Sequence, residues 1–390
     1  MTEPTILALN SGSSSLKFGL FTARGEQVRR ICSGAAEGIG SGSGSFWIRD
    51  ADGQTLLGKH RALSDQEESL RAVAQALSHL SFPVPAAIGH RIVHGGPKLR
   101  EHQQITSNVL RELEAAAPFA PLHVPIAVRM IRQAQEQFPG IPQFACFDTA
   151  FHRTLPESAA RFALPGKFWD AGIRRYGFHG LSCESILYKL GSDVPPRLII
   201  AHLGSGASVT AIADGASVDT TMGLTPTGGI VMSTRSGDLD PGVLLHIIRT
   251  HGVEPDHLEK LLDTESGLLG ISGISGDMRQ LHQLPTNSAA EEAIDIFCRT
   301  AKKSLGAFIA ILGGLDLLVF TGGIGEHDAI ARAQICSGLE SLGITLNPQK
   351  NKDGLQTISA SESRVRVWVM QTDEDEQIAR HTYRLLLHSS

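Results

Sequence analysis

Short apolar runs alternate with glycine- and serine-rich segments along the chain, which predicts buried strands joined by polar turns. Residues 6–9 form the first apolar run, and a second begins at Leu16. Between them lies Asn10-Ser-Gly-Ser-Ser-Ser15, which is longer than the two or three residues that a hairpin turn needs. The segment is either a polar turn or a cradle whose hydroxyls and backbone N–H groups face an anion, with Lys17 as the counter-charge.

The same pattern returns half a chain later. Residues 197–212 contain an apolar run, the turn Gly204-Ser-Gly206 and a second apolar run. Aligning Gly206 with Gly12 gives an offset of 194 residues (206 minus 12) in a chain of 390. The repetition predicts two related α/β domains.

A third glycine-rich turn follows the strand predicted over residues 315–320. Thr321-Gly-Gly-Ile-Gly-Glu326 leads from that strand into a helix predicted over residues 328–335. A strand, a glycine loop and a helix N-terminus together favour phosphate or nucleotide binding. The spacing matches neither a P-loop nor a dinucleotide-binding fingerprint.

Other segments show helical or strand periodicity. Helices are predicted over residues 64–80, 108–138 and 288–312, and the apolar stripe of the last indicates a core helix. The alternation around Val365, Val367 and Val369 predicts a strand that continues through Thr372-Asp-Glu-Asp-Glu376 into a closing helix.

Composition narrows the class of protein. A length of 390 residues, with 42% hydrophobic and 19% charged residues, predicts a soluble protein of two domains. A net charge of −5 without a lysine–arginine block argues against a nucleic-acid partner. The sequence has no apolar run long enough for a membrane span and no signal-peptide pattern at its start. Five scattered cysteines without a C-x-x-C pair favour free thiols in the cytoplasm.

Two segments offer candidate reactive groups in the first half of the chain. Arg91 lies between His90 and His94, and the flanking glycines disfavour the helix that a two-histidine metal site would use. Arg91 is either a substrate-binding cation or part of a structural ion pair. Asp148 follows a predicted strand, where a carboxylate suits a metal ion or a reacting group, although a helix N-cap would also place an aspartate there.

The second half offers further candidates. His179 lies beside glycines, and Arg235 lies in a turn-rich segment that could equally be a surface turn. Glu374 belongs to an acidic run that suits either a helix start or a metal ion. Together, two arginines, a strand-end carboxylate and three glycine turns are the groups that phosphoryl transfer requires.

Six motifs in order resemble the acetate kinase family. They are Asn10-Ser-Gly-Ser-Ser-Ser-Leu-Lys17, Gly89-His-Arg-Ile-Val-His-Gly-Gly96, Phe147-Asp-Thr-Ala-Phe-His152, Tyr176-Gly-Phe-His-Gly180, Thr234-Arg-Ser-Gly-Asp-Leu-Asp-Pro241 and Gly323-Ile-Gly-Glu326. The resemblance implies two duplicated actin-like (ribonuclease H-like) α/β domains around a central cleft. We expect residues 1–148 with the closing helix 376–390 in one domain, and residues 149–375 with most of the nucleotide site in the other.

The resemblance also implies a reaction and its participants. It implies reversible transfer of the γ-phosphoryl group of ATP to acetate, giving acetyl phosphate and ADP by direct in-line transfer in a homodimer. The metal ion would be Mg²⁺ or Mn²⁺. Propionate or butyrate as acceptor, pyrophosphate as donor, and a nucleotide-dependent sensor without turnover are the alternatives.

Individual residues take their roles from this resemblance. The catalytic residues would be Asp148, Arg91, Arg235 and His179, with His179 and Arg235 stabilising the transition state. The metal residues would be Asn10 and Glu374, and the acyl pocket would contain Arg91, Val93, Leu122, Phe178 and Pro226. The nucleotide residues would be Lys17, His202, Leu203, Gly204, Ser205, Gly206, Asp277, Met278, Arg279, Gly323, Ile324, Gly325 and Glu326. His123 also falls on a polar position of the family.

The chain departs from the family pattern at several positions. The phosphate loop His-Leu-Gly-Asn-Gly has serine at Ser205, and the Gly-Ile-Gly-Glu-Asn loop ends in His327. Cys183 replaces a histidine, Val124 replaces an asparagine, and the terminal Thr-Asn-Glu-Glu motif reads Thr372-Asp-Glu-Asp375. These departures leave the candidate catalytic groups in place and concern the nucleotide and the preferred acid.

Overall fold

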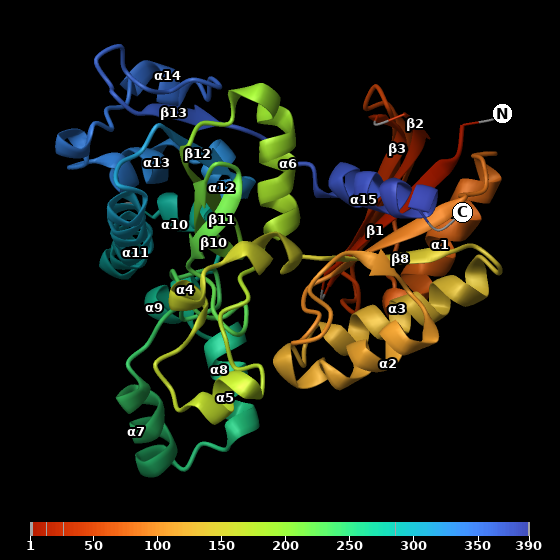
Figure 1. Ribbon diagram of the computed structural model, residues 1–390, viewed down its shortest axis with the longest axis horizontal. Helices are drawn as coiled ribbons and strands as arrows, with labels where there is room; N and C mark the ends of the chain where they lie inside the picture. Colours follow the sequence, from red (N-terminus) through yellow and green to blue (C-terminus); the bar gives the residue numbers. More distant parts are fainter. Residues whose placement is uncertain (1–2, 13, 26, 285, 389–390) are drawn as a thin grey trace. The chain divides into compact units, whose positions relative to one another are not determined.

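The computed structural model describes residues 3–12, 14–25, 27–284 and 286–388 (Figure 1). Ser13, which belongs to the first polar turn, lies outside the described residues. The chain divides into two compact units. Unit 1 comprises Met1–Ala150, Gly180–Ser185 and Asp373–Ser390, and unit 2 comprises Phe151–His179 and Ile186–Thr372.

Unit 1 is built on an eight-stranded sheet with the strand order β5-β4-β3-β2-β1-β6-β8-β7. The hairpin β1–β2 is antiparallel, and β6 and β8 then add in parallel beside β1. The strands are β1 (Thr5–Ser11), β2 (Ser15–Arg24), β3 (Gln27–Glu37), β4 (Ser45–Asp50), β5 (Thr55–His60), β6 (Ala87–Ile92), β7 (Gln103–Gln104) and β8 (Gln143–Phe147).

The two faces of this sheet bury different helices. Leu7 and Leu9 face a core shared with α1 (Gln66–His79) and α3 (Val124–Gln137), whereas Ile6 and Ala8 face a core shared with α15 (Glu374–His388). This alternation is the period of two that a strand buried on both faces requires. Helix α15, the last element of the chain, therefore packs on the strands of the first 150 residues.

Gly89 on β6 permits the close approach of α15. A Cβ atom there would lie 2.1 Å from Thr382 Oγ1 and 2.6 Å from Ile378 Cγ2, which is closer than van der Waals contact allows. The helix can therefore pack directly above the strand that carries Arg91 only because position 89 has no side chain.

Unit 2 repeats the central topology of unit 1. Its sheet has the order β11-β10-β9-β12-β13, with an antiparallel β9–β10–β11 meander followed by β12 and β13 in parallel. The order β3-β2-β1-β6-β8 in unit 1 has the same sequence of directions. The strands are β9 (Arg197–Leu203), β10 (Ala207–Ala213), β11 (Ala216–Thr220), β12 (Leu317–Thr321) and β13 (Arg366–Val369).

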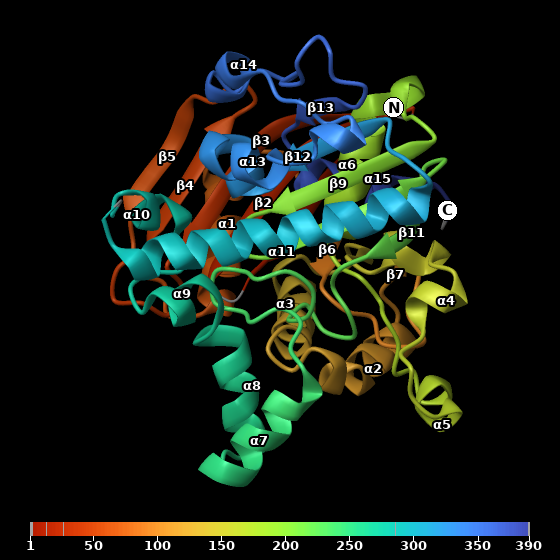
Figure 2. The ribbon, with the colours of Figure 1, turned by 90° about the vertical axis from the view of Figure 1, so that its left-hand side faces the viewer.

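The helices of unit 2 include α11 (Ser288–Leu312), which packs on β9 and β10 (Figure 2). Its buried stripe contains Ala293, Phe297, Ala301 and Leu305, in agreement with the predicted core helix. The other α-helices with residues in this unit are α4 (Glu157–Ala160), α5 (Gly166–Asp170), α6 (Gly180–Leu190, from Ile186 onward), α7 (Pro241–His251), α8 (Pro255–Thr264), α9 (Gly267–Ser272), α10 (Met278–His282), α12 (Gly322–His327), α13 (Ala329–Cys336) and α14 (Pro348–Lys352).

Two sequence predictions need correction. The helix predicted over residues 108–138 is two helices, α2 (Ser107–Ala115) and α3, separated by the short 3₁₀ turn η1 (Ala117–Phe119). Pro118 and Pro121 explain the break, because proline lacks the N–H that an uninterrupted helix needs. The glycine loop predicted over residues 321–326 is mostly helical, since α12 begins at Gly322.

The described helices of unit 1 and unit 2 lie within residues 3–12, 14–25, 27–284 and 286–388. Among them, no helix is both long and apolar enough to cross a bilayer.

His90 is a buried histidine in the core of unit 1. It is 3% exposed, and its Nε2 lies 2.8 Å from the Gln143 side chain. Burial lowers the pKa of His90 from 6.5 to about 4. The folded protein therefore keeps the ring neutral while the unfolded chain takes up a proton between these two values.

We predict that His90 makes the protein sensitive to acid. As pH falls from 6.5 to about 4, this residue should remove up to about 3 kcal/mol from the free energy of unfolding. His90→Gln should flatten that pH dependence, whereas His60→Gln, on the exposed part of β5, should not. Urea unfolding midpoints measured between pH 7 and pH 4 test this, and an unchanged slope in His90→Gln would contradict it.

Candidate functional site

In unit 1, a buried ion pair joins Arg91 at the end of β6 to Asp148 just beyond β8. Arg91 Nε donates to Asp148 Oδ2 at 3.0 Å, and Nη2 donates to the same oxygen. Asp148 is fully buried, and the Arg91 side chain is 17% exposed. Parallel pairing of β6 with β8 brings these two strand ends together. Asp148 does not act as a helix N-cap, because its carboxylate accepts hydrogen bonds from Arg91.

Asn10, at the end of β1, connects this pair to the start of α15. Its Oδ1 accepts a hydrogen bond from Arg91 Nη1 at 3.2 Å, and its Nδ2 donates to Glu374 Oε2 at 3.1 Å. Nδ2 also lies 3.4 Å from Asp375 Oδ1. Because one end of the amide faces a cation and the other faces carboxylates, its orientation is defined by its partners.

Burial and charge shape the protonation of this group. Burial disfavours the Arg91 cation, but the carboxylates of Asp148 and Glu374 outweigh burial and raise the pKa of the guanidinium. Burial raises the pKa of Asp148 above its usual value, opposed by Arg91. Burial also raises the pKa of Asp375 to about 6, and the nearby charge of Asp373 adds to this effect. Burial makes the ionised form of these carboxylates less favourable, so a proton or a metal cation nearby would stabilise them.

The charge balance of unit 1 at this point fits a divalent cation. The carboxylates of Asp148, Asp373, Glu374 and Asp375 face two guanidinium groups, Arg91 and Arg30, the second of which pairs with Asp373. Within the described part of the chain, no hydrogen-bond donor reaches the buried Asp148 Oδ1. Carboxylate and amide oxygens are the ligands that Mg²⁺ or Mn²⁺ takes.

A small pocket lies beside Arg91 within unit 1. Its lining residues are Ser11, Gly12, Arg91, Val93, His123, Ile126 and Ala127. The pocket thus combines one guanidinium and one imidazole with an apolar wall. Side chains that could recognise an anionic head group and a short apolar tail are therefore adjacent in unit 1.

In unit 2, two histidine rings lie together near the β9–β10 turn. His179 and His202 stack with ring centroids 4.2 Å apart, and His179 Nδ1 lies 3.0 Å from Ser208 Oγ. His179 has a left-handed backbone with φ of 58°, an uncommon conformation for a residue other than glycine. It is held immediately before α6, so the ring is positioned by local backbone geometry as well as by Ser208.

The glycine turn between β9 and β10 lies against both His179 and Arg235. A Cβ atom on Gly206 would lie 3.2 Å from His179 Nε2 and 3.4 Å from Arg235 Nη1. Arg235 Nη1 donates to the Pro226 carbonyl at 3.2 Å. Gly204 N–H donates to the Gly206 carbonyl at 3.1 Å, so it is used inside the turn, and Ser205 is exposed.

The start of α12 lies near the same turn. A Cβ atom on Gly204 would lie 3.8 Å from the Gly323 backbone nitrogen. Glu326 accepts a hydrogen bond from Gly322 N–H at 3.1 Å, so its carboxylate holds the first turn of the helix. The structure therefore brings together three segments of unit 2 that the sequence indicated separately: residues 202–206, Arg235 and residues 323–326.

The remaining candidates occupy varied positions. Asp277 caps α10 by accepting from Arg279 N–H at 2.9 Å, Arg279 is exposed and Met278 is buried. Lys17 is exposed on β2 and lies opposite Asn10 in the register of the β1–β2 hairpin. Leu122 is 44% exposed and is not among the residues that line the pocket beside Arg91, whereas Phe178 is buried in unit 2. The acyl-pocket roles of Leu122, Phe178 and Pro226 therefore stay predictions.

Several neighbours of these groups were not indicated by the sequence. Ser208 contacts His179 and belongs to no motif, whereas Asp375 contacts Asn10 and belongs to the acidic run 372–376, in which Glu374 alone was given a role. Position offers the one usable signal for Ser208, which lies two residues beyond Gly206 on a strand and so could be expected on the same face. Asp375 follows Glu374 directly and could have been expected near the same group.

Comparison with known proteins gives consistent matches over the whole length. A model described as the Acetokinase family matches residues 5–380. The chain is 43% identical over 391 residues to an acetate kinase of Rhodopseudomonas palustris, covering 97% of this chain and 98% of that protein.

Two crystal structures resemble the fold. A propionate kinase from Francisella tularensis gives a TM-score of 0.90 at 36% identity, and an acetate kinase from Porphyromonas gingivalis gives 0.86 at 34% identity. Each comparison covers 98% of this chain and 100% of the other. These likenesses, with the repeated strand order, confirm the predicted class of two duplicated actin-like α/β domains.

Proposed function

This chain belongs to the acetokinase family, and from that premise we propose that it transfers the γ-phosphoryl group of ATP reversibly to acetate, giving acetyl phosphate and ADP. The observation that best supports the proposal is the pocket of unit 1, where the Arg91 guanidinium adjoins the apolar side chains of Val93, Ile126 and Ala127. Acetate has the same two parts, a carboxylate and one methyl group.

The acceptor needs no strong base. A carboxylic acid with a pKa near 4 to 5 is about 99% ionised or more at pH 7, so its oxygen is already a nucleophile. Arg91 would bind this anion, and Asp148 would hold the guanidinium in a fixed orientation through its two hydrogen bonds. We therefore assign Asp148 to positioning and charge balance rather than to proton removal.

The metal ion of the reaction would be held by unit 1. We assign Asn10 and Glu374 to it, with the buried Asp148 Oδ1 and Asp375 nearby. When bound, Mg²⁺ or Mn²⁺ would neutralise charge on the phosphate oxygens. The excess of carboxylates over guanidinium groups is the property of the chain that supports this assignment.

The phosphates of the nucleotide are assigned to unit 2. His202, Leu203, Gly204, Ser205 and Gly206 form the turn that would contact them, with Gly323, Ile324, Gly325 and Glu326 at the start of α12, and Lys17 is assigned to the nucleotide from unit 1. Asp277, Met278 and Arg279 are assigned to the same ligand. Arg235 and His179, which both lie against Gly206, would stabilise the charge that develops during direct in-line transfer. These donors are held by the fold before any ligand binds, which is how electrostatic stabilisation of a transition state is achieved.

Propionate is the second candidate acceptor. The fold resembles that of a propionate kinase at 36% identity, and an additional methylene changes hydrophobic binding by only about 1–3 kcal/mol. A coupled assay with ATP, Mg²⁺ and acetate tests the main proposal, and replacement by propionate, butyrate or pyrophosphate tests the alternatives. No turnover with any pair, together with ADP binding by calorimetry, would instead favour a nucleotide-dependent sensor.

We further propose a homodimer in the cytoplasm. None of the residues of helix α7 is buried. Its apolar residues Val243, Leu245 and Ile248 are each about 40–50% exposed. Apolar side chains gathered in this way favour a protein partner. All five cysteines are buried free thiols, which suits a reducing compartment. Sedimentation velocity measures the oligomeric state directly.

We predict that replacing Arg235 lowers activity alone, whereas replacing Arg91 lowers both activity and stability. Arg235→Ala should lower kcat by roughly 10³-fold or more with little change in melting temperature, because its cation acts on transition-state charge. Arg91→Ala should lower kcat similarly and also destabilise the protein by about 3–5 kcal/mol, because Asp148 is left buried without its partner.

The double variant Arg91→Ala/Asp148→Asn provides the control for this difference. It should recover much of the lost stability but none of the activity. Steady-state kinetics and thermal unfolding measure both quantities, and near-normal turnover in either single variant would remove that arginine from the mechanism.

We also predict a gain from restoring the family asparagine at position 205. Serine offers one short hydroxyl where asparagine offers an amide donor, and a hydrogen bond to a charged group is worth about 1.5–3 kcal/mol. Because Gly204 N–H is occupied within the turn, a new side-chain donor should matter. Ser205→Asn should lower KM for ATP or raise kcat by up to roughly a hundredfold, with KM for acetate little changed. An unchanged or slower enzyme would show that the loop is adapted to serine.

A further inference from the structure

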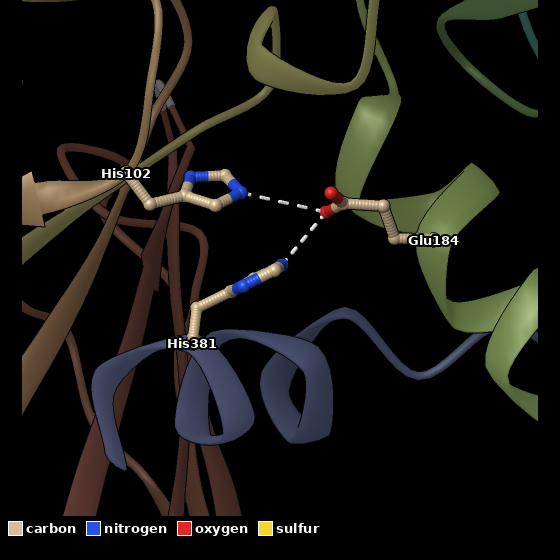
Figure 3. A group of neighbouring side chains, drawn as sticks. All are labelled: His102, Glu184 and His381. Carbon is tan, nitrogen blue, oxygen red and sulfur yellow. Dashed lines mark hydrogen bonds and ion pairs between the residues drawn. The ribbon is translucent and has the colours of Figure 1, made fainter. Parts of the chain in front are cut away.

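Two histidines converge on one carboxylate in unit 1, and none of the three residues was assigned a role above (Figure 3). His381 Nε2 lies 2.9 Å from Glu184 Oε2, and His102 Nε2 lies 3.6 Å from the same oxygen. The two rings are 3.9 Å apart between centroids. All three side chains are less than one-fifth exposed. We call His102, Glu184 and His381 the Glu184 cluster.

The cluster joins three segments that are distant in sequence. His102 immediately precedes β7, Glu184 lies on α6, and His381 lies on α15. Glu184 and His381 are 197 residues apart. The contact is therefore a tertiary tie, and no local motif predicts it.

Two histidines and a glutamate are also a donor set that zinc accepts. The hydrogen bond to the other nitrogen of His102 argues against that use. The backbone N–H of Phe147 donates to His102 Nδ1 at 3.0 Å, so Nδ1 uses its lone pair and the neutral ring carries its proton on Nε2. Nε2 is the atom that faces Glu184, and a metal ion would need its lone pair. The geometry thus favours an N–H donor to the carboxylate.

Charge supports the same arrangement. Burial disfavours the Glu184 carboxylate, but hydrogen bonds from His102 and His381 outweigh burial and lower its pKa below the usual range. Glu184 is therefore ionised throughout the range in which the enzyme would work. Its negative charge is fixed, and both imidazole rings face it.

Each segment tied by the cluster also leads to a residue of the candidate site. Phe147, which binds His102, is followed directly by Asp148. Gly180, the first residue of α6, donates its N–H to the Asp148 carbonyl at 2.9 Å. Next to Glu184 on the same helix, Ser185 Oγ accepts a hydrogen bond from Asp373 N–H at 2.8 Å.

The third connection runs along α15. Glu374, Gln377 and His381 are spaced at i, i+3 and i+7, so they share one face of the helix. A tie at His381 therefore fixes the rotation of the helix that presents Glu374 to Asn10.

We propose that Glu184 is a positioning residue for phosphoryl transfer: through His102 and His381 it fixes Asp148 and Glu374 relative to each other. It touches neither substrate nor metal ion and acts through the backbone of β8 and the rotation of α15. The proposal rests on the proposed function for its kinetic consequence, but its effect on metal binding can be measured without turnover.

Glu184→Gln tests the proposal because it removes the charge while keeping the size of the side chain. Affinity for Mn²⁺ in the presence of ADP, followed by electron paramagnetic resonance, should fall by roughly tenfold or more, as is usual when a partner of a metal ligand is lost. The value of kcat should fall by a similar factor, roughly tenfold, with KM for ATP changed less than about twofold. Glu112→Gln, which removes an ion pair with the exposed Lys98, is the matched control and should match the wild type.

A second pair of variants separates hydrogen bonding from packing. His381→Gln keeps an N–H donor toward Glu184, whereas His381→Leu fills similar space without one. The proposal requires the glutamine variant to keep Mn²⁺ affinity and kcat within about threefold of the wild type and the leucine variant to resemble Glu184→Gln. Equal losses in both would show a packing role and overturn it.

Two further results would overturn the proposal. One is a Glu184→Gln variant that behaves like Glu112→Gln in Mn²⁺ affinity and kcat. The other is stoichiometric zinc in the purified wild type that is absent from Glu184→Gln, measured by plasma mass spectrometry, because the cluster would then be a metal site. If the wild type binds Mn²⁺ and ADP but phosphorylates no carboxylate, the proposed function fails, while the Mn²⁺ measurements still decide the role of Glu184.

Discussion

The buried pair of Arg91 and Asp148 is the interaction on which the organisation of unit 1 depends. Neither charge can be held in so little water alone, because the cost of removing an ion from water is several kcal/mol. Each therefore requires the other, and together they recruit Asn10 from β1 and Glu374 from α15. The residues around the ion pair come from four segments: β1, β6, the end of β8 and α15. All four must be folded before Arg91 and Asp148 have all their partners, so the fold of unit 1 and the geometry of this group form together.

Charge is distributed differently in the two units. Unit 1 collects carboxylates around Arg91 and leaves an excess of negative charge, which is what a divalent cation requires. Unit 2 collects Arg235, His179 and His202 around a glycine turn, which is what phosphate oxygens require. The two polar groups descend from equivalent places in a repeated topology, because both lie beside the turn of the first hairpin of their sheet. The repeated topology is the common scaffold, and different side chains at equivalent places give each half a different charge.

Local patterns were enough to predict much of the fold. Apolar runs around glycine turns predicted β1–β2 and β9–β10, and the apolar stripe of residues 288–312 predicted α11 with its bounds. Proline broke the helix predicted over residues 108–138, although the pattern of apolar residues continued through it. Thr321–Glu326 was predicted as a loop because glycine disfavours helices, yet Glu326 accepts from Gly322 N–H and stabilises a helical turn there.

The site residues were predicted to different extents for a physical reason. Arg91 and Arg235 lie in motifs whose glycines constrain the backbone nearby, and Asp148 directly follows a buried strand, so each could be singled out from its neighbours in the sequence. Ser208, Asp375 and Glu184 contribute through partners far away in the sequence, and such pairing leaves no local trace. Leu122 was assigned to the acyl pocket through the resemblance alone. It is 44% exposed and does not line the pocket beside Arg91, so its role stays a prediction.

The position of helix α15 in the chain determines when the sheet of unit 1 can finish folding during synthesis. Asn10 and Glu374 are 364 residues apart, and the apolar face of α15 covers strands that are made long before it. The ribosome completes the sheet of unit 1 long before the helix that buries one of its faces exists. That face remains open in the nascent chain while all of unit 2 is being made. Folding of unit 1 is therefore completed only after unit 2 has been made. A ribosome that stalls before α15 would leave a chain with an uncovered sheet for chaperones to protect.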